Sequence, residues 1–413
     1  MAPPSLLSLF FCFLKIGCVS FGGFMSLVSM IETQVVEKRK WFDAEDMLDG
    51  VALATLLPGP MAVNTVAYVG YRLRGGLGAL VSSVAVLVPT VVFMLVLSDL
   101  YFRFGTLPQV ERIFFGILPA VAAIVLSVCL KMAAKNLKNV SHWCAFFMVV
   151  LLFFVLPSAY KVFATFGVVA VYGMVGVAAH LYGSRKMPGE EVAPFQNSVE
   201  SNKSVVKASN VRWLGFGLLG FILLLGVLPL PVAGDGYLAL MRTFSSMSLT
   251  LFGGGYVFIP MIQDVVVDQY GWVSAKEFID GIALGQVTPG PILISASFIG
   301  QKVAGVPGAL LSTVAIFAPP AVLMVLLSGM LGTIKSSKIV QSAMKGIRIA
   351  VIGLIFGAFL NILLMALPES MDMWGRTILV TSVFCLSFIA LYRFKMDVVW
   401  VIPAAGIVGF LFG

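Results

Sequence analysis

The stretch that decides the fold is Leu56-Leu57-Pro58-Gly59-Pro60, because its pattern returns 231 residues later as Val287-Thr288-Pro289-Gly290-Pro291. Both stretches lie inside long apolar runs. Each proline removes a backbone donor and disfavours helical geometry in the residue before it, and glycine adopts dihedral angles that other residues avoid. The two stretches therefore predict breaks inside two hydrophobic helices.

The breaks belong to a longer internal repeat. Residues 20–60 align with residues 251–291 at an offset of 231, with 16 of 41 positions identical. The identities include a Phe-Gly-Gly, a Trp and an Asp-Gly, which shared apolar composition would not produce. At an offset of 230 the alignment continues as far as Gly116 and Gly346. We interpret this pattern as an internal duplication.

The composition is that of a membrane protein. Of 413 residues, 60% are hydrophobic and 11% are charged, and the mean hydropathy is +1.02. A soluble domain is nearer half apolar and a quarter charged, so a soluble enzyme, a disordered chain and a collagen-like chain are excluded.

Thirteen runs are long and apolar enough to be candidate membrane spans. Four of them are broken by Gly or Pro, namely 5–31, 46–71, 237–262 and 278–301. We expect an all-α integral membrane protein with about 13 transmembrane segments, whose two homologous halves form an inverted repeat with broken helices. Whether 46–71 and 278–301 cross the membrane or re-enter is left open.

The halves divide the chain into three parts. We expect a first repeat with two extra spans at 1–182, a cytoplasmic polar linker at 183–211, and a second repeat of opposite orientation at 212–413. With the N-terminus in the cytoplasm and the C-terminus outside, thirteen crossings place 17 Lys and Arg residues inside and 9 outside, as in the cytoplasmic (inner) membrane. The basic cluster 38–40 falls on the outer side and does not fit.

The net charge of +8 is interpreted first as this topological bias and second as a sign of an anionic substrate. The expected partners are a small oxyanion and the lipid bilayer, not nucleic acid. The five cysteines form no metal-binding or disulfide pattern, and no metal or cofactor is expected.

The breaks predict a binding site. A break in mid-membrane is tolerated only around a protein-lined or watery cavity, and inverted-repeat transporters use such breaks to aim helix N-termini at an anion. Asn64 and Thr65 follow the first break, and Ser295 and Ser297 follow the second. The alternative is a packing kink whose hydroxyl groups are bonded to the preceding turn.

The candidate substrate-binding residues lie at the breaks, with one buried cation beside them. They are Lys15, Ser20, Phe21, Gly22, Gly23, Pro58, Gly59, Pro60, Asn64, Thr65, Phe252, Gly253, Gly254, Pro289, Gly290, Pro291 and Ser295. Lys15 either lines the cavity or extends to the interface. Arg72 and Lys302, at the ends of the Pro-Gly-Pro segments, are either entrance charges or interface anchors.

Asp49 and Asp280 are related by the repeat, and each is followed by glycine. Each is a candidate proton carrier or a cap of the helix that follows. The cap is the preferred interpretation.

The sequence resembles the chromate ion transporter family in its long, two-domain form, over roughly residues 10–135 and 240–365. The motifs that carry the resemblance are Ser20-Phe21-Gly22-Gly23, Glu37-Lys38-Arg39-Lys40-Trp41, Leu56–Pro60, Gly70-Tyr71-Arg72, Leu251–Gly255, Gly271-Trp272, Asp280-Gly281 and Thr288–Pro291. The resemblance implies chromate efflux, or transport of a related tetrahedral oxyanion such as sulfate. We expect alternating access between the inverted halves, with the anion bound between them.

Two other functions are compared with this one. A passive anion channel would use the same broken helices. An integral-membrane enzyme is less favoured, because the chain has two histidines and none of the spacings typical of a catalytic centre.

Overall fold

The computed structural model describes residues 4–21, 24–155, 158–186, 236–249, 251, 258–330, 337–367 and 374–412. Within these ranges all regular structure is helical. The first half contains α1 (Leu6–Val19), α2 (Phe24–Ile31), η1 (Glu32–Lys38), α3 (Ala44–Leu56), α4 (Met61–Phe104), α5 (Pro108–Asn136), α6 (Val140–Val155) and α7 (Ser158–Lys186). The second contains α9 (Tyr237–Ser248), α10 (Phe258–Gln263), η2 (Asp264–Gln269), α11 (Ala275–Val287), η3 (Ile292–Ile294), α12 (Ser295–Leu327), η4 (Ser328–Met330), α14 (Lys338–Ala366), α15 (Trp374–Tyr392) and α16 (Val398–Phe412).

The all-helical membrane fold is confirmed, but thirteen crossings are not. In the described part of the chain, five helices are long and apolar enough to cross a membrane by length and composition, and they belong to α4, α5, η3–α12, α14 and α15. The four runs that the sequence marks as broken are each divided into shorter helices. How these shorter helices are directed decides the topology.

The run 46–71 turns back on itself at its Pro-Gly-Pro. The guanidinium of Arg72, at its end, lies 3.1 Å from the carboxylate of Asp46, at its start. Between them Gly50 of α3 lies directly against the ring of Tyr68 of α4. The 13 residues of α3 extend about 20 Å, short of the roughly 30 Å of a hydrocarbon core. This run is a re-entrant hairpin.

The run 278–301 repeats the hairpin at equivalent positions. Lys302 and Glu277 form an ion pair of 2.9 Å, and Gly281 of α11 lies against the ring of Phe298 of α12. These residues align with those of the first hairpin through the duplication. Both Pro-Gly-Pro segments therefore re-enter, which answers the question that the sequence left open.

The run 5–31 also returns to the face from which it starts. Pro4, just before α1, accepts a hydrogen bond from Arg74, which follows the end of the first Pro-Gly-Pro hairpin. After α2 and the π-helix η1, the chain enters α3 beside Asp46, on the same face. In the second half, η2 is again a π-helix. The backbone amide of Trp272 donates to the carbonyl of Val266, and the amide of its equivalent Trp41 donates to the carbonyl of Val35.

A sharp turn follows each hairpin. The backbone leaves helical geometry at Arg74 and Gly75, where Gly75 has φ +64°, and α12 does the same at Ala304 and Gly305. The turn folds Gly78 against Gly70, where neither position leaves space for a side chain. The remaining 29 residues of α4 extend about 44 Å, enough to reach the opposite face.

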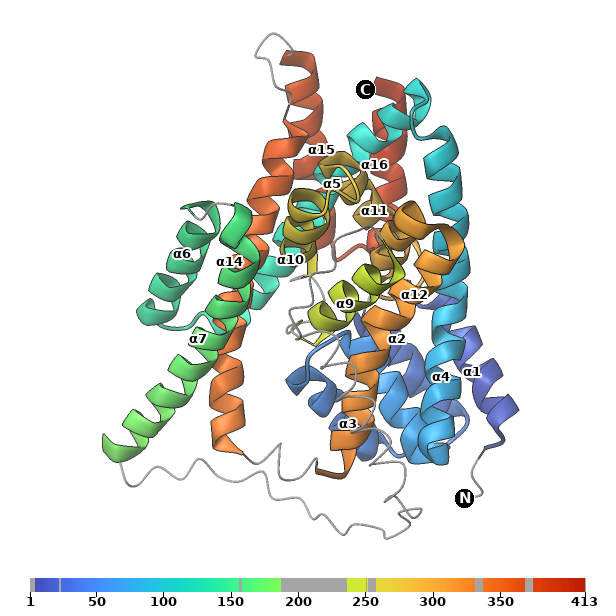
Figure 1. The fold of residues 1–413 in the computed structure, drawn as a ribbon, viewed down its shortest axis with the longest axis vertical. Coiled ribbons are helices and arrows are strands. Elements are labelled where there is room, and N and C mark those ends of the chain that lie inside the picture. The colour runs from blue at the N-terminus through green and yellow to red at the C-terminus, as the bar shows by residue number, and fades with distance from the viewer. Residues whose placement is uncertain are drawn as a thin grey trace.

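The two halves consequently point in opposite directions. We define the first face by Pro4, Asp46 and Arg72, and the second face by Glu111 and Lys276, which form an ion pair of 2.7 Å. In Figure 1, α1–α3 and the N-terminus lie near the lower, first face, and α10, α11 and the C-terminus lie near the upper, second face. The inverted repeat expected from the sequence is present.

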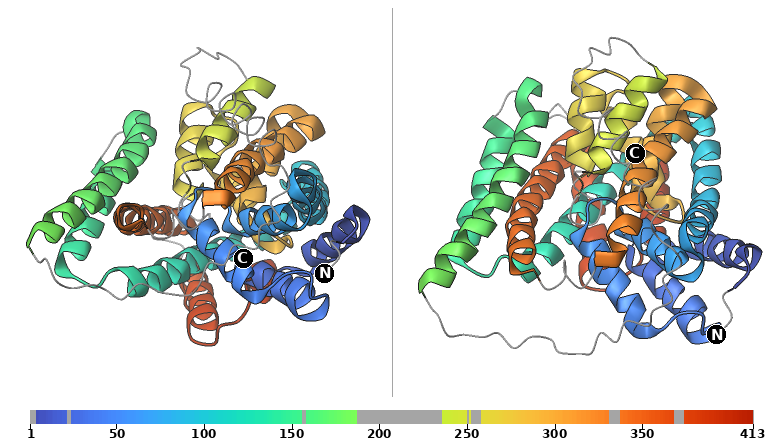
Figure 2. Two further views of the ribbon diagram at one scale, coloured as in Figure 1. Left: turned by 90° about the horizontal axis from the view of Figure 1, so that it is seen from below. Right: turned by 60° about the horizontal axis from the view of Figure 1, so that its bottom comes forward.

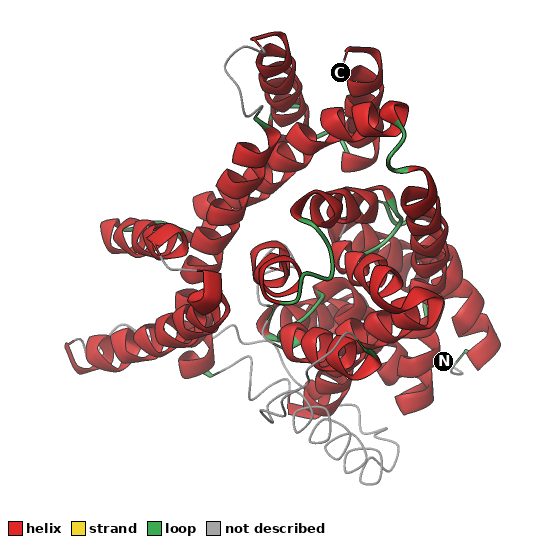
Figure 3. Cartoon of the chain, turned by 45° about the horizontal axis from the view of Figure 1, so that its top comes forward, coloured by secondary structure: helices red, strands yellow, loops and turns green. Residues whose placement is uncertain are grey.

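The helices form two groups. We call α1–α4 and α9–α12 the core bundle, and α5–α7 and α14–α16 the outer arm. Figure 3 shows the compact group around the N-terminus beside an extended row that ends at the C-terminus, and in Figure 2 α6 and α7 lie at the edge of the molecule next to α14. The halves exchange helices in this arm, because α15 and α16 pack on α5 whereas α6 and α7 pack on α14.

Glycine makes the close contacts of the arm possible. Gly116 of α5 lies against the backbone of Ala405 and Gly409 in α16, and its repeat equivalent Gly346 in α14 lies against Tyr172 of α7. A side chain at either glycine would collide with the backbone of the other helix. The two halves are thus interlocked, each completing the arm of the other.

The re-entrant topology predicts the sidedness of chemical labelling. Single cysteines at Glu45 and Leu77, on either side of the first Pro-Gly-Pro hairpin, should react with an impermeant thiol reagent from one side of the membrane. Cysteines at Lys276 and Val306 should react from the other side. These four positions are exposed. Labelling of Glu45→Cys and Leu77→Cys from opposite sides would mean that 46–71 crosses the membrane.

Candidate functional site

Each Pro-Gly-Pro tip closes on the helix break of the other half. The amide of Gly59 donates to the carbonyl of Leu251 at 2.6 Å, and the amide of Gly290 donates to the carbonyl of Ser20 at 2.9 Å. Ser20 and Leu251 are repeat equivalents, as are Gly59 and Gly290. The two bonds are therefore one contact made twice, and they bring the four broken segments to one place.

Both glycines have backbone geometry that other residues avoid. Gly59 has φ +97° and Gly290 has φ +126°. A side chain on Gly59 would collide with Pro320, and one on Gly290 would collide with Thr90. Thr90 and Pro320 are also repeat equivalents, and the Thr90 hydroxyl donates to the carbonyl of Pro289. Glycine is required here for both conformation and space.

Three of the predicted polar residues use their hydroxyl protons within their own helix. Ser20 donates to Ile16 at 2.6 Å, Thr65 to Met61 at 2.8 Å and Ser295 to Ile292 at 2.8 Å. All three predicted residues are buried. This is the bonding of the packing-kink alternative, and in this conformation these hydroxyls retain only acceptor capacity.

Asn64 and Ser297 differ, because each has a polar atom without a partner. The side-chain amide of Asn64 donates to the carbonyl of Pro58 at 3.0 Å, but its Oδ1 and the Oγ of Ser297 have no hydrogen bond within the described ranges. Both residues are completely buried. An unmade hydrogen bond of a buried polar group costs about 1–3 kcal/mol, so these atoms favour a polar ligand or water beside them.

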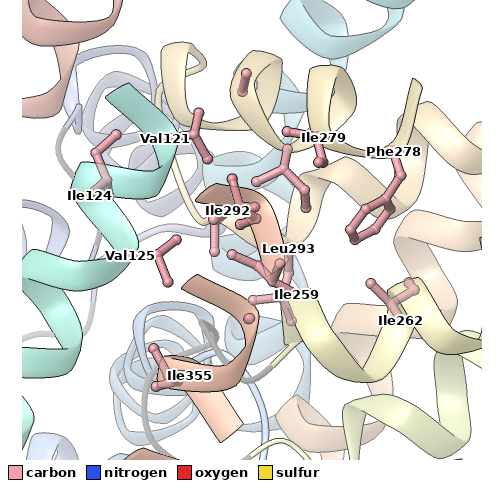
Figure 4. Packing of buried hydrophobic residues seen from close by; sticks show 14 of the residues in the cluster. Val121, Ile124, Val125, Ile259, Ile262, Phe278, Ile279, Ile292, Leu293 and Ile355 are labelled. Carbon is pink, nitrogen blue, oxygen red and sulfur yellow. The ribbon is translucent and has the colours of Figure 1, made fainter. Parts of the chain in front are cut away.

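The second tip is set into an apolar environment that reaches the outer arm. Figure 4 shows Ile292 and Leu293, just after the Pro-Gly-Pro, among side chains of α5, α10, α11 and α14. Among them are Val121 and Val125 of α5 and Ile355 of α14. The contact between this tip and the arm is therefore apolar.

Five predicted site residues lie outside the described residues, namely Gly22, Gly23, Phe252, Gly253 and Gly254. The flanking Phe21 is partly buried. Pro58, Pro60, Pro289 and Pro291 are buried at the two tips.

Lys15 does not point into the protein. Helix α1 buries Cys12, Phe13 and Ile16, whereas Lys15 lies on its exposed face, with Phe11 57% exposed on the same side. The prediction that Lys15 contributes a cation to the cavity is therefore corrected. Its position fits the alternative, an interfacial lysine whose alkyl stem lies along the helix surface.

Arg72 and Lys302 lie on opposite faces, as expected, but neither is an unpaired entrance charge. Arg72 pairs with Asp46 and Lys302 with Glu277. Burial alone would raise the pKa of Glu277, but hydrogen bonds from Lys302 and Ser274 lower it below its ordinary value, so the carboxylate stays charged. Sequence reasoning missed both acids, although they occupy equivalent positions in the repeat, which was the available signal.

Asp49 and Asp280 do not cap helices, so the preferred interpretation was wrong. They lie in the middle of α3 and α11. The N-cap position of α3 is Asp43, whose side chain makes no capping hydrogen bond, and α11 begins with a Ser274–Glu277 capping box. Asp280 is 5% exposed, and its carboxylate accepts a hydrogen bond of 2.7 Å from Tyr101 of α4. Asp49 is partly exposed.

The chemistry of the site suits a small anion. Helices α4 and η3–α12 begin at the two tips, so their positive dipole ends meet there. The nearby side chains that the structure describes are neutral, and in the described ranges no group of three or more His, Cys, Asp or Glu comes together that could hold a metal ion. Such an arrangement binds negative charge by dipoles and hydrogen bonds without a fixed counter-charge.

Comparison with known proteins identifies the family of this chain. The profile of the chromate transporter family matches residues 7–177 and 238–410. An uncharacterised transporter of Methanocaldococcus jannaschii is 30% identical over 99% of this chain and 94% of its own length. A chromate transport protein of Cupriavidus metallidurans is 28% identical over 84% of this chain and 80% of its own length.

A shorter relative matches a single repeat. An uncharacterised transporter of Bacillus subtilis is 26% identical over 44% of this chain but 96% of its own length. No solved structure matches the chain. On the family profile, which covers both halves, this multi-pass membrane protein belongs to the chromate transporter family.

Proposed function

We propose that this chain exports chromate across the cytoplasmic membrane and that sulfate competes for the same site. The observation that carries the proposal is the meeting of two inverted Pro-Gly-Pro tips, each hydrogen-bonded to the helix break of the other half. Relatives named as chromate transport proteins support chromate as the substrate. Sulfate is included because it has the same charge and tetrahedral shape.

The site is proposed to lie at the tips. A dianion must lose much of its water to cross, and burying bare charge is prohibitive. The helix N-termini at Met61 and Ile292, together with the Ser297 hydroxyl, can replace part of that water. No full positive charge among the described residues is fixed there, which favours release as well as binding.

Transport is proposed to proceed by alternating access, with the core bundle moving against the outer arm. The reciprocal tip contacts join the two halves at the site, so separating the halves there would break both bonds. The contacts between the core bundle and the outer arm, by contrast, differ between the two halves. The second half packs α11 on α5 and α16, and α10 on α14, whereas α1, α2 and α3 pack with α4 in a separate apolar cluster.

This asymmetry suggests what the alternative conformation is. In an inverted repeat, a second conformation can arise in which each half adopts the packing that the other half has now. The face that is closed in the first conformation is then open in the second. The ion pair Glu111–Lys276 joins arm and bundle on the second face. Its repeat equivalents are Gln341 and Glu45 on the first face, and we expect these two to approach each other when the second face opens.

The hairpins support an orientation of the chain in the membrane. If 5–31 and 237–262 re-enter instead of crossing, the basic cluster 38–40 is assigned to the same side of the membrane as the N-terminus. Lys276 is then assigned to the opposite side. The distribution of Lys and Arg then changes from 17 against 9 to 19 against 7. We therefore propose a cytoplasmic N-terminus and an external C-terminus, with repeats at 1–182 and 212–413 and a cytoplasmic linker between them. The conformation described would then be closed to the outside.

The transport proposal predicts chromate flux in everted membrane vesicles. Vesicles that contain the protein should accumulate labelled chromate in a saturable manner, and sulfate should reduce the rate. Vesicles from cells that lack the protein are the control. Absence of protein-dependent chromate movement under every imposed gradient would contradict the proposal.

Alternating access predicts two cross-links that cannot form in the same conformation. In a background without the exposed Cys18, Cys144 and Cys385, the pair Glu111→Cys/Lys276→Cys should cross-link readily and block chromate flux. The pair Glu45→Cys/Gln341→Cys should cross-link only when the first pair is separated. A passive channel would conduct chromate with the Glu111/Lys276 cross-link in place, so retained flux would contradict alternating access.

The unpartnered hydroxyl predicts a selective loss of affinity. Ser297→Ala should weaken chromate binding ~10-fold, because a hydrogen bond to a charged group contributes about 1.5–3 kcal/mol. Ser295→Ala is the matched control, since its hydroxyl already donates to Ile292. The concentration dependence of chromate uptake measures both. Equal half-saturation concentrations for the two variants would remove Ser297 from the site.

A further inference from the structure

Asp280 is a buried carboxylate that the proposed binding site does not use. It is 5% exposed in the middle of α11. Within the described part of the chain it forms no ion pair, and its hydrogen bond comes from the Tyr101 hydroxyl. A carboxylate at membrane depth without a cation partner is costly and is a candidate functional group.

The neighbouring cations are engaged elsewhere. Lys276, one turn before Asp280, pairs with Glu111 at 2.7 Å, and Lys302 pairs with Glu277 at 2.9 Å. The charged and titratable groups around Asp280 are Tyr101 of α4, Glu111 of α5, Lys302 of α12, and Lys276 and Glu277 of α11 itself. The other elements packed on α11, which are α10, η3 and α16, contain none.

The repeat does not reproduce the residue pair Tyr101–Asp280 in the other hairpin. The repeat equivalent of Asp280 is Asp49, but the equivalent of Tyr101 is Leu331, which cannot donate a hydrogen bond. In this conformation Asp280 is buried and Asp49 is partly exposed. Asp280 is buried because α11 packs on α4 and on the outer arm at the second face. Its burial is therefore linked to closure of that face.

We propose that Asp280 is a proton-binding site of the transporter and that Tyr101 is its positioning residue, so that anion transport is coupled to proton movement at this carboxyl. This inference rests on the proposed function. When the second face opens, Asp280 meets water and exchanges a proton; when the face closes, Tyr101 covers it. The step is the uptake or release of one proton by a carboxylate, and no electron is transferred.

The position of Asp280 provides the link to the substrate. It lies nine residues before Pro289, about 13 Å when counted at the helical rise, and both positions are buried. At that distance in a protein interior, a bound dianion raises the proton affinity of a carboxylate. Anion binding and protonation therefore favour each other.

The main test uses Asp280→Asn in proteoliposomes, with chromate as the substrate and a pH-sensitive dye inside. In the wild type, chromate flux should be accompanied by proton flux and accelerated by a pH gradient. In Asp280→Asn, both the proton flux and the acceleration should disappear, while exchange of labelled for unlabelled chromate continues. Asp268→Asn, an exposed aspartate of the second half, is the control and should behave like the wild type.

Tyr101→Phe tests the positioning role. Without the hydroxyl the carboxylate loses a hydrogen bond, so its proton affinity increases. The pH profile of chromate exchange should move to higher pH by about one unit, with the maximal rate retained. A role in packing alone would lower the rate or the yield of protein without moving the profile, and that result would remove Tyr101 from the proposal.

Two outcomes overturn the proton site. One is a gradient response of Asp280→Asn equal to that of the wild type, and the other is wild-type chromate flux without proton movement. Infrared difference spectroscopy gives a readout without chromate, because a titrating carboxylic acid band should be present in the wild type and lost in Asp280→Asn. The band could be present in the wild type and absent from Asp280→Asn although the wild type transports no chromate. This result would support the proton site and contradict the proposed substrate.

Discussion

The structure depends on one backbone contact made twice. The amide of each Pro-Gly-Pro glycine donates to the carbonyl that precedes the Phe-Gly-Gly of the opposite half, Gly59 to Leu251 and Gly290 to Ser20. A helix that breaks within a membrane exposes backbone groups that lipid cannot satisfy. By pairing the tip of one half with the break of the other, the duplication satisfies part of this demand internally. Positive φ angles and the absence of side chains make the approach possible.

This contact also sets what can move. Because the tips hold the halves together, the core bundle is best regarded as one body, and the exchanged helix pairs of the outer arm form a second. The bundle contacts the arm through the hairpins of the second half and not in the same way through those of the first. A duplicated sequence thus adopts a conformation in which the two halves pack differently, and the proposed alternating access rests on this asymmetry.

Burial of the aspartates follows the same asymmetry. Asp49 and Asp280 are equivalent in sequence, but Asp280 is buried and accepts a hydrogen bond from Tyr101, whereas Asp49 is partly exposed. The ion pairs at the hairpin bases behave differently, because Asp46–Arg72 and Glu277–Lys302 are present in both halves. Contacts within a hairpin are therefore the same in both halves, whereas contacts between a hairpin and the rest of the protein differ between the halves.

The sequence by itself determined the class of protein, the duplication, the position of the two Pro-Gly-Pro breaks and the family. These follow from composition and from the local chemistry of Gly and Pro, which act on their own backbone wherever the chain goes. The same local chemistry is why Ser20, Gly59 and Gly290 stand out as candidate residues in the sequence alone.

Only the tertiary structure decided the direction of the chain after each break. A 13-residue helix that ends in Pro-Gly-Pro can continue or return, and the choice depends on distant partners such as Arg72 for Asp46 and Tyr68 for Gly50. The exposed position of Lys15 and the enclosure of Asp280 were decided in the same way. Which face of a helix is buried depends on the helices packed against it, and in a membrane protein, where lipid-facing and protein-facing positions are both apolar, hydrophobic patterning does not reveal that face.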